Sequence, residues 1–345
     1  MARFTLAVSG LNASENPAPG VGVARSLLED PDLDLRLVGL VYDALEPGAY
    51  LDWLFSKSYL MPYPSGGKDA FLSRLAHLAQ RESVDFCLPT LDLEIPLYIR
   101  YADEIKAMGL KTWLPEMGPF KERGKDQLQR LAQVMGLKVP QTEMVTSPQE
   151  LEEACEKEGF PLLIKGAFYQ ATEVWTMPQA LAAYHSIVAI WGYPVLVQER
   201  IEGEEVNLVG VGDGEGGSLG EVAIKKMSVT KERKIWSGVT IHQQSLSDAS
   251  SAFLGHYRWR GAYEIECLVR DEALYLIEIN PRFPAWTYFA TGVGVNLPAR
   301  MVKAAMGIDP GPNPSYAPGK LFMRYTYECI KDLKEFQNLT LHGET

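Results

Sequence analysis

The start of the chain alternates between short apolar runs and segments with helical spacing, and this alternation constrains the fold more than any other feature. Apolar runs occupy residues 4–9, 35–41 and 84–88, and helical spacing occupies residues 20–29 and 69–81. Strands that alternate with helices pair in parallel, within a sheet that the helices cover. We therefore predict an N-terminal α/β domain with a parallel sheet over residues 1–115.

A different pattern begins near residue 125, after a linker at residues 114–124 that contains two prolines and two glycines. Helices are predicted at residues 128–136, 148–158, 178–191 and 298–306, and strands or extended segments at 139–145, 161–165 and 195–198. Strands dominate the remainder up to about residue 275, with a tight turn at residues 213–217. This mixture predicts an α+β architecture after the first domain.

The charge balance restricts the partners of the chain. Its 345 residues are enough for two or three domains, and its net charge is −11 at pH 7. Nucleic-acid binding needs a basic face that releases counterions from the phosphates. We therefore expect no nucleic-acid partner.

The sequence indicates neither a disulfide framework nor a membrane segment. Its four cysteines stand far apart without a C-x-x-C pair, which favours a reducing compartment. The chain contains no run of about 18 apolar residues, and it begins with a strand rather than a cleavable apolar signal. We expect a cytoplasmic protein with no membrane partner.

The stretch at residues 263–283 alternates like two strands joined by a turn, and it carries the chemistry. Glu278 and Asn280 share one face of the second strand. A three-residue turn, Asp271 to Ala273, would place Glu266 directly opposite Glu278. Two facing carboxylates need a cation, and carboxylate and amide oxygens suit Mg²⁺. A four-residue turn would instead place the two glutamates on opposite faces of the hairpin, as ordinary solvated residues. The pattern is compatible with either turn.

The spacing of Glu266, Glu278, Asn280 and Arg282 resembles the metal-ligand signature of ATP-grasp enzymes, among them biotin carboxylase and carbamoyl phosphate synthase. The resemblance covers residues 125–306. It implies that Glu266, Glu278 and Asn280 bind Mg²⁺, with Mn²⁺ as an alternative ion. It also implies that Arg282 is catalytic and stabilises the phosphoryl oxygens and the developing negative charge.

The resemblance extends to the nucleotide site. Residues 197–207 are similar to the segment that lines the adenine pocket in this superfamily, where the backbones of Glu199 and Ile201 would read the adenine edge. Gln198 would reach the exocyclic amine, and Glu205 would accept the ribose hydroxyls.

Two lysines, Lys125 and Lys165, match the phosphate-contacting positions of these enzymes, and Lys225 and Lys226 are further candidates. The loop at residues 166–174 departs from the pattern, because a glycine-rich lid is expected there and only its first residue is glycine. We expect this loop to contact substrate as well as nucleotide.

By this resemblance the chain divides into four parts. A Rossmann-like pre-ATP-grasp domain at 1–115 precedes a small lid subdomain at 121–198, a large subdomain with the metal site at 199–312 and a C-terminal segment at 313–345.

The implied activity is that of an ATP-dependent, ADP-forming carboxylate–amine ligase, closest in character to carbamoyl phosphate synthase. Its partners would be an amino acid or peptide carboxylate and an amine, and a homodimer is allowed. The alternatives are a phosphotransferase or an enzyme forming carboxyphosphate or carbamoyl phosphate, and a nucleotide-binding regulator without turnover.

Overall fold

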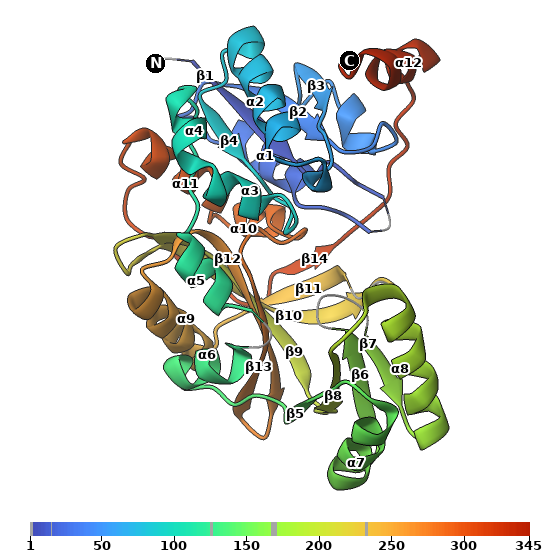
Figure 1. Cartoon of the computed structure of the whole chain (residues 1–345). Coiled ribbons are helices and arrows are strands. Elements are labelled where there is room, and N and C mark those ends of the chain that lie inside the picture. Colours follow the sequence, from blue (N-terminus) through green and yellow to red (C-terminus); the bar gives the residue numbers. More distant parts are fainter. Residues whose placement is uncertain (1–2, 15, 125–126, 167–170, 232–233) are drawn as a thin grey trace. The chain divides into compact units, whose positions relative to one another are not determined.

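The computed structural model describes residues 3–14, 16–124, 127–166, 171–231 and 234–345 (Figure 1). The chain forms two compact units. The first combines Met1–Lys121, Val206–Ile265 and Ile279–Thr345, and the second combines Glu122–Glu205 and Glu266–Glu278. The compact units thus draw on segments distant in sequence, whereas the predicted four-part division follows the chain and stays a prediction.

The N-terminal sheet of the first unit is parallel throughout, which confirms the prediction. Its strand order is β3-β2-β1-β4. The strands are β1 (Phe4–Ser9), β2 (Leu35–Val41), β3 (Lys57–Leu60) and β4 (Phe86–Leu88). Leu6 of β1 lies opposite Leu37 of β2 and Phe86 of β4. Because β1 has neighbours on both sides, the chain reverses its direction of travel across the sheet after β3.

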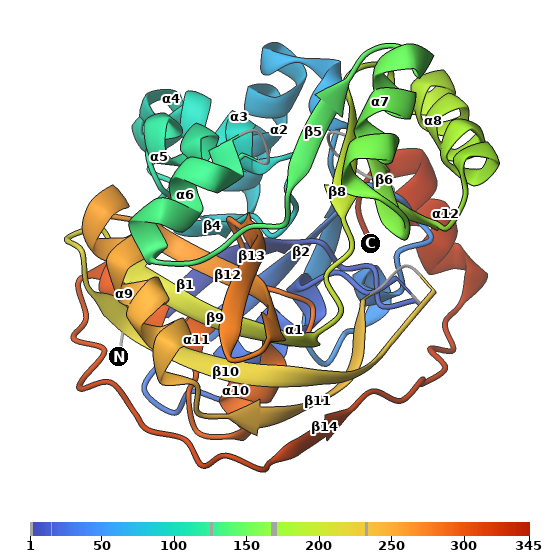
Figure 2. The same ribbon diagram turned by 90° about the horizontal axis from the view of Figure 1, so that it is seen from below.

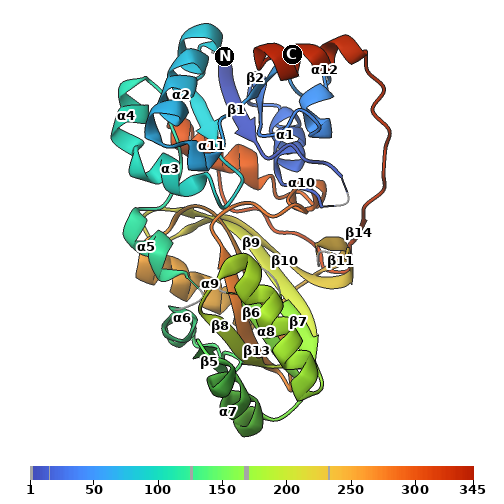
Figure 3. The same ribbon diagram turned by 45° about the vertical axis from the view of Figure 1, so that its right-hand side comes forward.

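Helices cover both faces of this sheet (Figure 3). The first face packs on α1 (Gly20–Leu28), α10 (Tyr288–Gly292) and α11 (Leu297–Met306), and the second on α2 (Lys68–Glu82), α3 (Ile95–Arg100) and α4 (Ala102–Ala107). Alternate residues of β1 decide the face: Leu6 and Val8 belong to the first core, and Ala7 to the second. The predicted linker at 114–124 is partly helical, because α5 (Met117–Glu122) buries Phe120 in the second core.

A six-stranded sheet has the order β13-β12-β9-β10-β11-β14 (Figure 2). Its strands are β9 (Glu204–Asp213), β10 (Ser218–Val229), β11 (Ile235–Ile241), β12 (Arg260–Arg270), β13 (Ala273–Asn280) and β14 (Leu321–Met323). Antiparallel pairing places Val222 of β10 opposite Val209 of β9. The strand-rich region also contains a helix that the sequence analysis missed, α9 (Gln244–Tyr257), which contacts β10.

The second unit contains an antiparallel sheet of order β5-β8-β6-β7. Its strands are β5 (Thr142–Val145), β6 (Leu162–Gly166), β7 (Ala171–Val174) and β8 (Val195–Glu199). The helices α7 (Pro148–Glu158) and α8 (Met177–Trp191) pack together on one face of this sheet (Figure 3). Another helix of this unit, α6 (Leu128–Met135), ends at Gly136 in the left-handed conformation, in agreement with the helix predicted up to residue 136.

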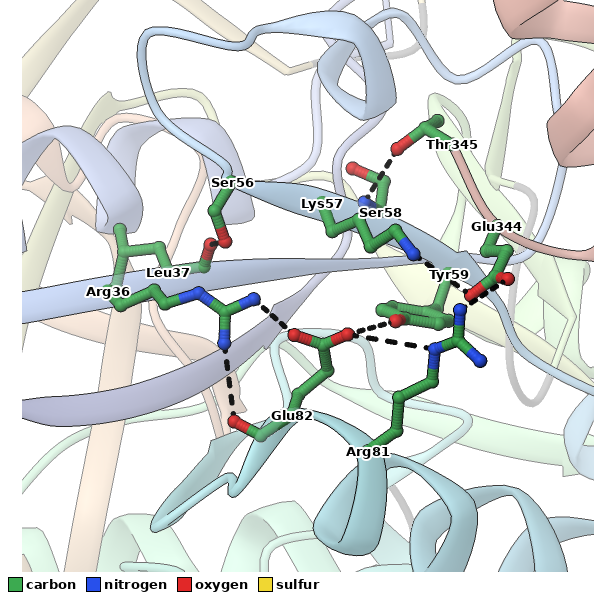
Figure 4. A network of polar contacts seen from close by, with 10 residues as sticks. All are labelled: Arg36, Leu37, Ser56, Lys57, Ser58, Tyr59, Arg81, Glu82, Glu344 and Thr345. Carbon is green, nitrogen blue, oxygen red and sulfur yellow. Dashed lines mark hydrogen bonds and ion pairs between the residues drawn. The ribbon is translucent and has the colours of Figure 1, made fainter.

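The end of the chain is fixed to the N-terminal sheet. Helix α12 (Leu333–His342) contacts β3, and Thr345 donates its backbone N–H to Ser58 O at 3.0 Å. The Glu344 carboxylate lies 3.3 Å from Lys57 Nζ and 2.9 Å from Arg81 Nη2 (Figure 4). The described part of the first unit also contains two short 3₁₀ helices, Pro47–Tyr50 and Pro64–Gly66. Within the described ranges, we find no helix with the length and apolar character needed to span a bilayer.

Candidate functional site

The hairpin of β12 and β13 turns on two residues, Asp271 and Glu272. Both have left-handed backbones, with φ of 50° and 64°, as a type I′ turn requires. The three-residue turn and its four-residue alternative are therefore both wrong, because β12 ends at Arg270 and β13 begins at Ala273. A regular ladder from this turn pairs Glu266 with Ile277, which would place Glu266 and Glu278 on opposite faces.

The far end of the hairpin has a side-chain contact that a regular ladder from this turn does not predict. Asn280 Nδ2 donates to Glu264 Oε2 at 3.1 Å, so these two side chains share a face. Near the turn, Arg270 Nη2 donates to Tyr275 Oη at 2.7 Å. This contact agrees with the two-residue turn, which places both side chains on the same face. A regular ladder cannot satisfy both contacts, because each strand changes face at every residue. We infer a one-residue shift between them, and the common face of Glu266 and Glu278 stays a prediction.

Asn280 and Arg282 lie together at the end of β13. Arg282 Nη2 approaches Asn280 Oδ1 at 3.4 Å, and Arg282 Nε donates to Asp92 Oδ2 at 2.7 Å. The arginine side chain is only 12% exposed. Asp92 follows β4, so a loop of the N-terminal sheet fixes the guanidinium through its Nε. Such an anchored fork suits a phosphoryl or carboxylate group.

In the second unit, two of the predicted nucleotide residues contact each other. Lys165 Nζ of β6 donates to Gln198 Oε1 of β8 at 2.5 Å, and Gln198 Nε2 donates to Thr142 Oγ1 at 2.8 Å. Gln198 is only 5% exposed. The amide of Gln198 thus orients the lysine, and it would have to exchange these partners to reach an adenine.

The remaining predicted residues lie on several elements. Glu199 donates its backbone N–H to Gln141 O at 2.8 Å, so an adenine contact would use its carbonyl oxygen. Ile201 is buried in the segment after β8, and Glu205 is half-buried in β9. Lys225 and Lys226 are neighbours in β10 and half-buried. Lys125 and the central residues 167–170 of the predicted lid lie outside the described residues.

Known structures with this arrangement were found by fold comparison, whereas no protein-family model matches the sequence. The biotin carboxylase domain of 2-oxoglutarate carboxylase from Hydrogenobacter thermophilus has a TM-score of 0.67 at 15% identity, over 90% of this chain and 71% of that one. N5-carboxyaminoimidazole ribonucleotide synthetase from Thermus thermophilus also has a TM-score of 0.67, at 16% identity over 93% and 81%. D-Alanine–D-alanine ligase from Bacillus anthracis has a TM-score of 0.59, at 14% identity over 88% and 95%.

These are ATP-grasp ligases, and each likeness covers most of both chains. The chain has the ATP-grasp fold. Two of the relatives hold nucleotide: the biotin carboxylase domain is a dimer with MgADP, ADP and bicarbonate, and the D-alanine ligase holds ATP.

The predicted metal ligands have the donor chemistry of a divalent-cation site. Two carboxylates, Glu266 and Glu278, and the amide oxygen of Asn280 are hard oxygen donors of the kind that Mg²⁺ accepts. Asn280 is 8% exposed, and its amide nitrogen is directed at Glu264, so its oxygen is the end turned away from that carboxylate. Among the described side chains, no group of three or more His, Cys, Asp and Glu could hold a metal, and the predicted set has only two carboxylates.

Sequence reasoning missed two buried carboxylates of the first unit. One is Glu264, which lies two residues before Glu266. The other is Glu94, at the carboxyl edge of the parallel sheet, which accepts hydrogen bonds from Ser9 Oγ and Tyr42 Oη. Alternation could have identified Glu264, because Glu264 and Glu266 are both acidic at positions of one strand face.

Three of the four aromatic residues that follow β13 belong to the core, and the fourth, Tyr288, is half-buried. Phe283, Trp286 and Phe289 are at most 7% exposed and pack in the core of the first unit. Tyr288 donates its hydroxyl to Glu29 at 2.6 Å and lies under Arg25.

Proposed function

We propose that this protein is an ATP-dependent ligase that joins a carboxylate to an amine, with release of ADP and phosphate. The observation that carries the proposal is the paired Asn280 and Arg282 at the end of β13, in a chain with the ATP-grasp fold. The nucleotides in two structural relatives support ATP and Mg²⁺ as its cofactors, with Glu266, Glu278 and Asn280 as the metal ligands.

The reaction would proceed in two displacements. A carboxylate oxygen attacks the γ-phosphorus of ATP, the bond from that phosphorus to ADP breaks, and an acyl phosphate forms. The amine nitrogen then attacks the acyl carbon, the bond from that carbon to the phosphate oxygen breaks, and phosphate leaves with the proton that the nitrogen gives up. Arg282, held by Asp92, would stabilise the equatorial phosphoryl oxygens in the first step. Bound Mg²⁺ would neutralise charge on the phosphates.

Further residues would bind the nucleotide. Lys165 would contact its phosphates as a mobile point charge, and Lys125 is proposed for the same role. Gln198, the backbones of Glu199 and Ile201, and Glu205 would hold the adenosine. The substrate class that we propose is an amino acid or peptide carboxylate, in a carbamoyl phosphate synthase-like subtype. The dimeric biotin carboxylase relative supports a homodimer.

The test is coupled ADP release from Mg-ATP with pooled amino acids and short peptides. We expect ADP formation that requires both a carboxylate and an amine component. The rate of ADP formation should fall at least about 100-fold in Glu278→Ala, because the Mg²⁺ that neutralises the phosphates loses one of its proposed ligands. Glu272→Ala is the matched control, since it removes an exposed glutamate from the turn of the same hairpin and should retain full activity.

Other products would identify the alternatives. Formation of AMP and pyrophosphate would contradict the acyl phosphate. ADP release without an amine would indicate a phosphotransferase or carboxyphosphate-forming enzyme. Tight ATP binding without turnover in any pool would favour the nucleotide-binding regulator.

A further inference from the structure

A buried carboxylate, Glu264 of β12, lies at the centre of a polar cluster in the first unit. It is 3% exposed. Its Oε1 accepts from Asn207 Nδ2 of β9 and from Trp286 Nε1 after β13, each at 2.8 Å. Its Oε2 accepts from Asn280 Nδ2 of β13 at 3.1 Å. Three N–H donors from separate segments thus converge on one side chain.

The carboxylate determines which way round the Asn280 amide lies. An ionised carboxylate has acceptor oxygens only, so the groups that face it must donate. If the amide turned over, its oxygen would face a carboxylate oxygen in a site that excludes water, and this is costly. The Asn280 oxygen consequently points away from Glu264, and Arg282 Nη2 approaches it at 3.4 Å.

We propose that Glu264 is a positioning residue for the metal–nucleotide site: it orients the Asn280 amide so that its oxygen, and not its nitrogen, is presented as a ligand. This rests on the proposed function, because it takes Asn280 as a ligand of the Mg²⁺ that accompanies the nucleotide. An amide nitrogen carries two hydrogens and cannot bind Mg²⁺, so a reversed amide removes one ligand.

Glu264→Gln tests the orientation with almost no change of shape. The glutamine oxygen can still accept from Asn207 and Trp286, and its NH₂ group then faces Asn280. The Asn280 amide must reverse to accept this new N–H. We expect the affinity for ADP in the presence of Mg²⁺ to fall about 10-fold or more, in the range found for residues that orient metal ligands. The affinity for metal-free ADP should change less than about threefold. Calorimetric titration of ADP with and without Mg²⁺ measures both.

Asn280→Asp in the Glu264→Gln background supplies the rescue. The introduced carboxylate accepts from the NH₂ group of the introduced glutamine and still presents an oxygen, so Mg²⁺-dependent affinity should return to within about threefold of wild type. Asn280→Asp alone places two buried carboxylates in contact and should lower the melting temperature, and Glu264→Gln should suppress that loss. This second readout requires no nucleotide.

Glu221→Gln is the matched control. Glu221 is a half-buried carboxylate of β10 that accepts from Ser250 Oγ at 2.9 Å, away from the Glu264–Asn280 contact. Its variant should retain the Mg²⁺ dependence of ADP binding.

Three results would overturn the positioning role. The first is a lower melting temperature in Glu264→Gln with unchanged Mg²⁺ dependence, which would make Glu264 purely structural. The second is a double variant that binds no better than Glu264→Gln. The third is wild-type protein whose ADP affinity does not depend on Mg²⁺. Absence of turnover would instead count against the ligase alone, because this test measures binding and stability.

Discussion

At the scale of single residues, buried carboxylates surrounded by donors recur in the first unit. Glu94 is fully buried and accepts from the backbone N–H groups of Thr90 at 2.8 Å and Leu91 at 3.0 Å, besides Ser9 and Tyr42. It therefore joins the carboxyl ends of β1, β2 and β4. Open α/β sheets bind ligands at that edge, so the hydrogen bonds of Glu94 hold together the loops of a candidate binding site.

The pH dependence of stability should reveal the cost of burying Glu94. Burial raises the pKa of Glu94 above its ordinary value of 4.5, although its hydrogen bonds with Ser9 and Tyr42 oppose the rise. A carboxyl whose pKa is raised by folding contributes stability below the ordinary pKa, and this contribution is lost as pH rises through the folded pKa. The free energy of unfolding of wild type relative to Glu94→Gln should therefore decrease from about pH 4 upward. Urea unfolding across the pH range measures it, and a constant difference would contradict the prediction.

At the scale of elements, the turn of the β12–β13 hairpin is built from residues that its conformation disfavours. Asp271 and Glu272 both have positive φ, which costs a residue with a side chain about 1–2 kcal/mol relative to a right-handed backbone. Asn-Gly is the preferred pair for this turn. The hairpin therefore forms because its strands pair within the sheet, and not because its turn directs it.

The double variant Asp271→Asn/Glu272→Gly should stabilise the protein by about 1 kcal/mol, because it relieves the unfavourable φ values while the glycine costs some entropy. Thermal unfolding measures the gain. Asp271→Gln/Glu272→Ala removes the same two charges and keeps a side chain other than asparagine at both positive φ values, so it should give no gain. Equal stabilisation by both variants would attribute the effect to charge.

The same turn illustrates what the sequence could and could not predict. Periodicity located β1, β2, α1, α2, α7 and α8, because their apolar residues repeat at strand or helix spacing. Helix α9 escaped notice because Ala249 and Ser250, which are buried on its inner face, are not strongly hydrophobic. The type I′ turn escaped notice because Asp-Glu is not a sequence that predicts one. Alternation placed Glu278 and Asn280 on one face, but the register that relates them to Glu266 depends on the ladder.

At the scale of the whole molecule, ion pairs join segments that are distant in sequence (Figure 4). Glu82 at the end of α2 accepts from Arg36 Nη2 of β2 and from Tyr59 Oη of β3. Arg81, the preceding residue, pairs with Glu344. Burial disfavours ionisation of Glu82, but the hydrogen bonds with Tyr59 and Arg36 outweigh it and lower its pKa. One helix end thus connects two strands and the final residues.

Glu82→Ala should destabilise the protein by about 3 kcal/mol, because it leaves the Arg36 charge without its buried partner. Glu344→Gln should cost less than about 1 kcal/mol, since its partners Lys57 and Arg81 are partly solvated. Denaturant unfolding at neutral pH compares them. A lowered carboxyl pKa means that the contribution of Glu82 is present above about pH 4.5 and is lost as pH falls through the folded pKa. Similar losses in both variants would contradict the distinction.

The cluster around Glu264 also has a consequence for how this protein can change over evolutionary time. Both oxygens of the Glu264 carboxylate accept from N–H donors, so an amide at position 264 would reverse the Asn280 amide and turn its oxygen away from the proposed ligand position. A lineage that loses the acid at position 264 can restore the match most directly by gaining one at position 280. Residues 264 and 280 are therefore expected to change together, and a designer who substitutes one of them has to substitute the other as well.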